Sequence, residues 1–118
     1  MKQSTSNCGA RLNVDHLAQE IRDEIIRGLI LCVLVKYRLE WMTFGSLRIQ
    51  VQRGQGYTLD ENELRFHLAY LSDSTRAYIE CKSLRAGRAT TDFSLVRATA
   101  KAVDLLDGRI APDPGIVF

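Results

Sequence analysis

The residues that could do chemistry in this chain are few and widely spaced. His67 follows Glu63 by four residues, so a helix would place both side chains on one face. A metal site needs three or four ligands. Neither His67 nor His16 has a cluster of cysteines or carboxylates of recognisable ligand spacing around it. The sequence therefore predicts no metal site and no cofactor.

Catalytic groups are equally difficult to assemble from the sequence. No serine, histidine and aspartate, and no cysteine and histidine, occur in a context typical of a nucleophilic site. Gly54-Gln55-Gly56 is too short for a dinucleotide-binding loop, and no strand is expected before it. We therefore expect that the protein is not an enzyme.

Charge is distributed unevenly along the chain. Residues 76–101 contain six basic and two acidic residues, a net charge of +4. Residues 59–75 contain four acidic residues against Arg65 alone, a net charge of −3. A basic segment suits a phosphate backbone, because phosphate contacts supply most of the affinity for nucleic acid. The acidic segment that precedes it opposes such binding.

A long first helix is predicted to begin at Asn13 or Asp15, since both are suitable N-cap residues. An apolar repeat every four residues indicates this helix: Leu17, Ile21, Ile25 and Leu29. Residues 29–35 are all apolar, and a helix that is apolar on every side must be covered on every side. A buried strand is the alternative for this segment. We expect a core helix, with a dimer seam as the second interpretation.

Two shorter helices are predicted next. Apolar residues spaced three and four apart predict a second helix that ends near Gly54: Phe44, Leu47 and Val51. Asp60 followed by Glu63 matches a capping box, which predicts a third helix over residues 60–74. Its predicted buried stripe consists of Leu64, Leu68 and Leu71.

The remainder of the chain predicts a β-hairpin and a last helix. Alternating side chains over residues 77–82 and 93–97 indicate two strands, joined by a loop around Gly87. Thr99 can cap a short helix over residues 101–106, and the prolines that follow exclude a helical tail. The predicted fold class is mainly α with a small β-hairpin (α+β): a three-helix core, the hairpin and a short C-terminal helix.

Three stretches of sequence resemble one known family. They are GYTLDENELRFHLAYL (56–71), Tyr78-Ile79 at the start of the hairpin and ATAKAVDLL (98–106). Together with the order of the elements, they resemble the winged helix-turn-helix family of small bacterial and phage DNA-binding regulators. The resemblance covers residues 23–108. It implies a recognition helix over residues 60–74 and a wing formed by the hairpin.

The resemblance implies a set of DNA contacts. A recognition helix enters the major groove, where its exposed side chains meet base edges; here these would be Asn62, Arg65 and Phe66. The second helix and the wing, residues 82–92, would contact phosphates through Arg48, Arg53, Lys82, Arg85 and Arg88. The implied function is sequence-specific binding of duplex DNA by a small, phage-derived transcriptional regulator. It would act as a homodimer through the N-terminal apolar helix.

A second class of function stays open. The same fold could serve as a protein–protein interaction module that does not bind DNA. The apolar first helix and Ile116-Val117-Phe118 would then dock a partner. The acidic third helix favours this alternative, whereas the basic hairpin favours DNA binding.

Length and composition set the frame for both interpretations. The chain has 118 residues and a net charge of +2, with 46% hydrophobic and 25% charged residues, as in one soluble globular domain. Three cysteines without CxxC spacing, and no targeting or membrane segment, predict a cytoplasmic protein. We expect a flexible segment over residues 1–12, a domain over 13–108 and an extended tail over 109–118.

Overall fold

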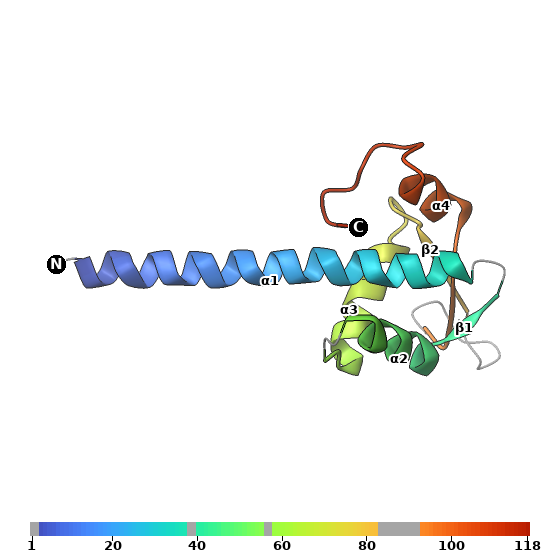
Figure 1. The fold of residues 1–118 in the computed structure, drawn as a ribbon, viewed down its shortest axis with the longest axis horizontal. Coiled ribbons are helices and arrows are strands. Elements are labelled where there is room, and N and C mark those ends of the chain that lie inside the picture. Colours follow the sequence, from blue (N-terminus) through green and yellow to red (C-terminus); the bar gives the residue numbers. More distant parts are fainter. Residues whose placement is uncertain (1–2, 38–39, 56–57, 83–92) are drawn as a thin grey trace.

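A computed structural model of the chain describes residues 3–37, 40–55, 58–82 and 93–118. Its elements are, in order, α1 (Gln3–Lys36), β1 (Met42–Thr43), α2 (Phe44–Gln55), α3 (Glu61–Ser72), β2 (Ile79–Lys82), β3 (Leu95–Ala98) and α4 (Ala100–Leu106). Helix α1 crosses the body of the molecule, with α2 on one side, α4 and the C-terminal tail on the other, and α3 passing behind it (Figure 1). The fold is α+β, as predicted, and is compatible with a winged helix.

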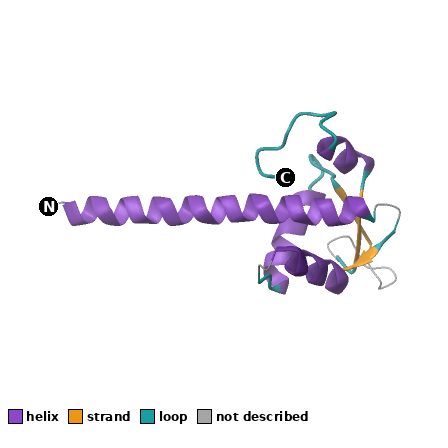
Figure 2. Cartoon of the chain, in the orientation of Figure 1, coloured by secondary structure: helices purple, strands orange, loops and turns teal. Residues whose placement is uncertain are grey.

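Helix α1 extends far beyond the rest of the molecule. It has 34 residues, a length of about 51 Å at 1.5 Å per residue, and its N-terminal part projects from the packed body (Figure 2). The sequence predicted that this helix begins at Asn13 or Asp15, but it begins at Gln3. Small polar residues suggested fraying there. Once a helix is nucleated, however, each further residue adds a hydrogen bond at little cost.

The buried face of α1 is not the one that carries the four-residue repeat. The α1 side chains that are at most 1% exposed are Ile26, Ile30, Leu31 and Leu34. In the repeat, Ile21 is 54% exposed, Ile25 and Leu29 are only half-buried, and the side chain of Leu17 lies outside those described. Cys32 is exposed as well. Helix α1 therefore has two apolar faces, and the one that contains Ile21 lies at the surface of this chain.

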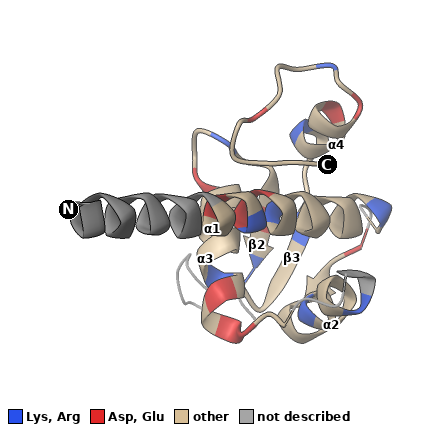
Figure 3. Ribbon diagram, turned by 60° about the vertical axis from the view of Figure 1, so that its left-hand side comes forward, with Lys and Arg blue, Asp and Glu red and all other residues tan. Residues whose placement is uncertain are grey.

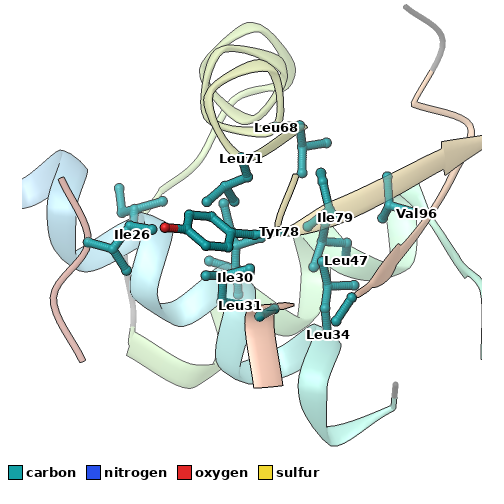
Figure 4. Close-up of a cluster of buried hydrophobic side chains, with 14 of the residues drawn as sticks. Ile26, Ile30, Leu31, Leu34, Leu47, Leu68, Leu71, Tyr78, Ile79 and Val96 are labelled. Carbon is teal, nitrogen blue, oxygen red and sulfur yellow. The ribbon is translucent and has the colours of Figure 1, made fainter. Parts of the chain in front are cut away.

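The hydrophobic core forms where α1 crosses α3 and the sheet. It combines the buried face of α1 with side chains from the later elements (Figure 4): Leu47, Leu68, Leu71, Tyr78, Ile79 and Val96. The three leucines predicted to form the stripe of α3 are all 0% exposed. Burial of a leucine side chain contributes about 1.5–3 kcal/mol to the free energy of folding. The core therefore fixes α3 firmly against α1.

Three antiparallel strands form one sheet in the order β1-β3-β2. Met42 pairs with Val96, and Ile79 pairs with Ala98. The hairpin strands were predicted, but β1 was not, because two residues carry no readable alternation. Strand β2 starts two residues later than predicted because Ala77 has a φ of 51°, a left-handed conformation that interrupts an extended strand.

Helix α4 and its two ends agree closely with the prediction. It begins at Ala100 and ends at Leu106, and Gly108 follows with a φ of 76°, which glycine adopts without steric cost. Thr99 occupies the N-cap position, as predicted. Its hydroxyl donates to the carbonyl oxygen of Ala77 at 2.7 Å instead of capping the helix. Thr99 therefore ties α4 to the start of the hairpin.

The C-terminal tail folds back on its own chain. Asp113 accepts hydrogen bonds from the hydroxyls of Tyr70 at 2.9 Å and Tyr78 at 3.0 Å. The guanidinium carbons of Arg27 and Arg76 lie 3.9 and 3.7 Å from the centre of the Tyr70 ring. With the hydrogen bond that Arg27 donates to the carbonyl oxygen of Gly115 at 3.2 Å, these contacts join the tail to α1, to α3 and to the residue before β2.

Two glycines allow the tail to approach the helices closely. A Cβ atom on Gly28 would collide with the carbonyl oxygen of Val117, whose N–H donates to Glu24 at 3.0 Å. A Cβ atom on Gly115 would collide with the hydroxyl of Tyr70. The packing of the tail therefore requires glycine at both positions.

Candidate nucleic-acid interface

Helix α3 is oriented by its cap and by its buried face. The carboxylate of Asp60 accepts a hydrogen bond from the backbone N–H of Glu63 at 2.7 Å, as the capping box predicts. The Glu63 side chain does not complete the box; it pairs instead with Arg22 of α1. The buried face consists of Leu64, His67, Leu68 and Leu71. The opposite face therefore points into solvent.

The three residues predicted to contact bases lie on this solvent-facing side of α3. Asn62 is exposed, Phe66 is 58% exposed and the Arg65 side chain is 52% exposed. The Phe66 ring lies 5.7 Å from the guanidinium carbon of Arg27 and meets the His67 ring edge-on. The structure thus brings Asn62, Arg65 and Phe66 together on one accessible helix face.

Arg65 links this face to the base of the β2–β3 hairpin. Its guanidinium carbon lies 4.9 Å from the centre of the Phe44 ring, at the start of α2. Phe44, Arg65, Phe93 and Ser94 line a recess of about 130 Å³. The N–H of Phe44 also donates to the carbonyl oxygen of Ser94 at 3.1 Å. The exposed face of α3 and the start of β3 therefore adjoin in one surface.

The predicted phosphate-contacting arginines occupy different settings. Arg48 is half-buried and donates from Nε to the carbonyl oxygen of Leu59 at 2.6 Å, so it holds α2 against the turn before α3. Arg53 is exposed in the last turn of α2. Arg85 and Arg88 fall outside the described residues. Of the two predicted arginines that the structure describes, Arg53 is the one whose charge is accessible, beside the turn that precedes α3.

Lys82 lies at the end of β2, on the face of the sheet that points away from the core. It is exposed, and its Nζ atom lies 5.6 Å from the centre of the Trp41 ring. The guanidinium carbon of Arg97 is 4.4 Å from the same ring, and Arg97 pairs with Glu80 at 3.1 Å. Sequence reasoning did not select Trp41 or Arg97, because their proximity depends on the pairing of β1 with β3.

Three acidic residues around α3 are paired with arginines, and a fourth, Asp60, caps the helix. Figure 3 shows acidic residues at the first turn of this helix, which gave the segment its negative charge in the sequence. Each partner reduces the repulsion that a nearby phosphate would experience, although exposed pairs are weak. The pairs are Arg22–Glu63, Arg65–Glu61 at 3.6 Å and Arg76–Asp73 at 3.1 Å.

A second group of ionisable side chains lies between α3 and α1. His67 is 0% exposed, and its Nε2 atom is 3.7 Å from a carboxylate oxygen of Asp23. Burial lowers the pKa of His67, Arg27 lowers it further, and the carboxylates of Asp23 and Glu63 only partly oppose these effects. The ring is therefore neutral near pH 7. The sequence indicated that Glu63 and His67 share a helix face, but no spacing could reveal that Asp23 joins them from α1.

Comparisons with known proteins identify no relative for this chain. A scan against models of protein families finds no match. Searches of curated protein sequences and of solved structures also find none. Among the described residues, no helix combines the length and the apolar character needed to cross a lipid bilayer. Function is therefore inferred from the geometry and chemistry of the chain itself.

Proposed function

We propose that this chain is a winged-helix protein that binds duplex DNA, a small cytoplasmic transcriptional regulator of the type found in bacteria and phages. Helix α3 lies in the major groove, and the β2–β3 hairpin follows the phosphate backbone. An α-helix fits the width of the major groove. Arginine and asparagine are the side chains that pair bidentately with guanine and adenine edges. Arg65 and Asn62 take these roles.

The observation that carries the proposal is the position of Arg65. It is half-exposed on the outward face of α3 and, at the same time, lines the recess at the base of the hairpin with Phe93 and Ser94. A duplex that contacts α3 at this point is adjacent to the hairpin. The exposed Arg53 and Lys82 then supply phosphate contacts from the neighbouring elements.

A homodimer is part of the same proposal, and its seam is the exposed apolar face of α1. Ile21 is 54% exposed. Further along, Ile25, Leu29 and Cys32 line a recess of about 330 Å³ with the tail residue Phe118. Two copies of α1 packed along this face would bury it and support the projecting part of the helix. The two recognition helices would then read half-sites about 34–36 Å apart.

A protein–protein interaction module is the second candidate, and one observation favours it. Val117 and Phe118 are 44% and 59% exposed beside the apolar face of α1. Together they form an apolar surface on which another protein could dock without DNA. The DNA-binding function requires a polyanion as its ligand, whereas the interaction module does not.

A salt-dependent DNA titration tests the proposed function. The fluorescence anisotropy of a labelled random-sequence duplex is measured against protein concentration at low and at moderate salt. The proposal expects binding that weakens steeply with salt, because counterions are released from each contacted phosphate. Replacing Arg85 and Arg88 with Ala should lower the log–log salt slope by about 2. The absence of association at low salt would leave the interaction module.

A further inference from the structure

Three side chains with metal-binding chemistry meet between α1 and α3. They are Asp23 from α1 and Glu63 with His67 from α3. One ligand atom from each lies within 4.8 Å of the other two. The carboxylate side chains of Asp23 and Glu63 are 20% and 21% exposed, while His67 is fully buried behind them. The cluster is therefore open to solvent on its carboxylate side and closed on its imidazole side.

Ion pairing between the side chains of this cluster does not explain why the ring of His67 is buried. Neither of its ring nitrogens has a hydrogen-bond partner among the described residues. Its Nε2 atom points toward Asp23 at 3.7 Å, beyond hydrogen-bonding distance. A buried polar atom without a partner costs free energy, so such an atom calls for an explanation such as an ion. A cation placed between the two residues would satisfy Nε2.

We propose that Asp23, Glu63 and His67 bind a divalent transition-metal ion, for which Zn²⁺ is the natural probe, and that the ion links α1 to α3. Zn²⁺ takes histidine nitrogen and carboxylate oxygen at 2.0–2.2 Å, so two ligand atoms on a tetrahedral ion lie about 3.4 Å apart. The separation of 3.7 Å between His67 and Asp23 is already close to this value. Water completes the coordination from the exposed side.

Two features of the chain prepare the site. Phe66 packs its ring against the His67 ring, with centroids 5.3 Å apart, which fixes the imidazole. The ligands come from two helices that the core already holds together, so metal binding requires only small movements of the three ligand side chains.

Arg22 is the internal competitor of the ion. Its guanidinium forms an ion pair with the Glu63 carboxylate and donates to the carbonyl oxygen of Thr58 at 3.0 Å. Binding a metal exchanges one cation for another at Glu63, while the Arg22 side chain, 28% exposed, turns toward solvent. This competition predicts an unusual result: removing Arg22 improves metal binding. The inference is independent of DNA binding.

Calorimetric titration of the full-length chain with ZnCl2, in a reducing buffer without thiols or chelators, tests the site. The wild type should bind one ion per chain, and D23N and E63Q should each weaken binding about tenfold or more. These carboxylates are partly exposed, so both variants avoid disturbing the core at His67. D104N removes an exposed carboxylate on α4 and serves as the matched control, with H16Q as the control for the other histidine. No binding, or equal affinity in D23N and wild type, would overturn the proposal.

The R22Q variant gives the second, independent readout. It should bind Zn²⁺ several-fold more tightly than wild type and show a larger rise in melting temperature on addition of the ion. A purely structural ion pair would give the opposite behaviour, namely a destabilised R22Q chain that Zn²⁺ does not restabilise. That result would overturn the proposal even if the wild type retained weak binding.

Discussion

The guanidinium of Arg65 lies over the ring of Phe44, with 4.9 Å between the guanidinium carbon and the ring centre, and thereby joins α3 to the first residue of α2. The ring restricts the orientation of the side chain and still leaves it 52% exposed. An arginine that is oriented before binding loses less conformational freedom when it pairs with a base edge or a phosphate. Arg65 is therefore the most informative position at which to test the proposed DNA interface.

Replacing Arg65 with Ala should weaken DNA binding by about 1–3 kcal/mol, roughly tenfold to a hundredfold, because a bidentate base contact is lost. Arg109→Ala is the matched control. Arg109 is 71% exposed and follows α4, where it pairs with Asp104 and Asp107. Anisotropy titrations of both variants at one salt concentration compare them, and melting curves confirm that both are folded. Equal affinities for the two variants would exclude Arg65 from the interface.

Ile21→Glu should convert the proposed dimer into a monomer. A charge at this position disfavours burial of the exposed face of α1 in a seam. Ile49→Glu is the control, since Ile49 is 53% exposed on α2, almost the same as Ile21 at 54%. Sedimentation at micromolar concentration measures the mass of each species. A wild-type mass of 13.3 kDa would contradict the dimer, as would an I21E variant that remains dimeric.

Gly28→Ala should destabilise the chain by about 1–3 kcal/mol, the usual cost of overpacking a close contact. The added Cβ would collide with the backbone of Val117, which cannot rotate away as a side chain could. Gly45→Ala provides the control, because a Cβ there meets no atom within 4 Å and lies within α2. That variant should be neutral or stabilised by up to about 1 kcal/mol. Urea unfolding curves measure both, and equal stabilities would show that the tail is not docked.

Stability should fall at both ends of the pH scale because of the tail cluster. Burial favours a higher pKa for Asp113, but hydrogen bonds from Gly115, Tyr70 and Tyr78, with the charge of Arg76, hold it below its ordinary value. The Asp113 carboxylate therefore contributes to the free energy of unfolding above its unfolded pKa of about 3.9. This contribution is lost as pH falls through the pKa of Asp113 in the folded chain. Burial and the hydrogen bond to Asp113 raise the pKa of Tyr78 to about 12. The contribution of the Tyr78 hydroxyl to stability is complete below pH of about 10, and it is lost as pH rises toward 12.

The variant D113N isolates the acid half of this behaviour. It should lower the melting temperature at pH 7 and flatten the dependence of melting temperature on pH below about 4, since no carboxylate remains to titrate there. Y78F should remove part of the loss of stability above pH of about 10. Thermal melts monitored by circular dichroism at intervals of pH measure both. An unchanged acid dependence in D113N would show that other carboxylates control acid unfolding.

Much of the fold could be predicted from local chemistry. Asp60 caps α3, the leucines of that helix are buried, and Gly108, which has a positive φ, follows the end of α4. Each of these features is encoded by a few neighbouring residues. Local signals could not identify the buried face of α1, because Ile21 and Ile26 belong to two apolar faces of one helix. The sequence contains both repeats, and only packing against the other elements selects between them.

The candidate sites depend on longer-range pairing, which the sequence does not display. Glu63 was predicted to bond back to its own cap, but it pairs with Arg22, which lies 41 residues earlier in the chain. Asp23 approaches His67 only because α1 crosses α3. Likewise, the position of Arg65 on α3 was predictable from the helical period, but its contact with Phe44 was not.

The most direct test of the central claim is a map of the DNA contacts in solution. Backbone amide resonances of the labelled protein are followed during titration with a short duplex. We predict that the largest changes in chemical shift occur at Asn62, Arg65, Phe66 and Lys82, with little change in α4. Shifts confined to α1 and the tail, or no shifts at low salt, would contradict it.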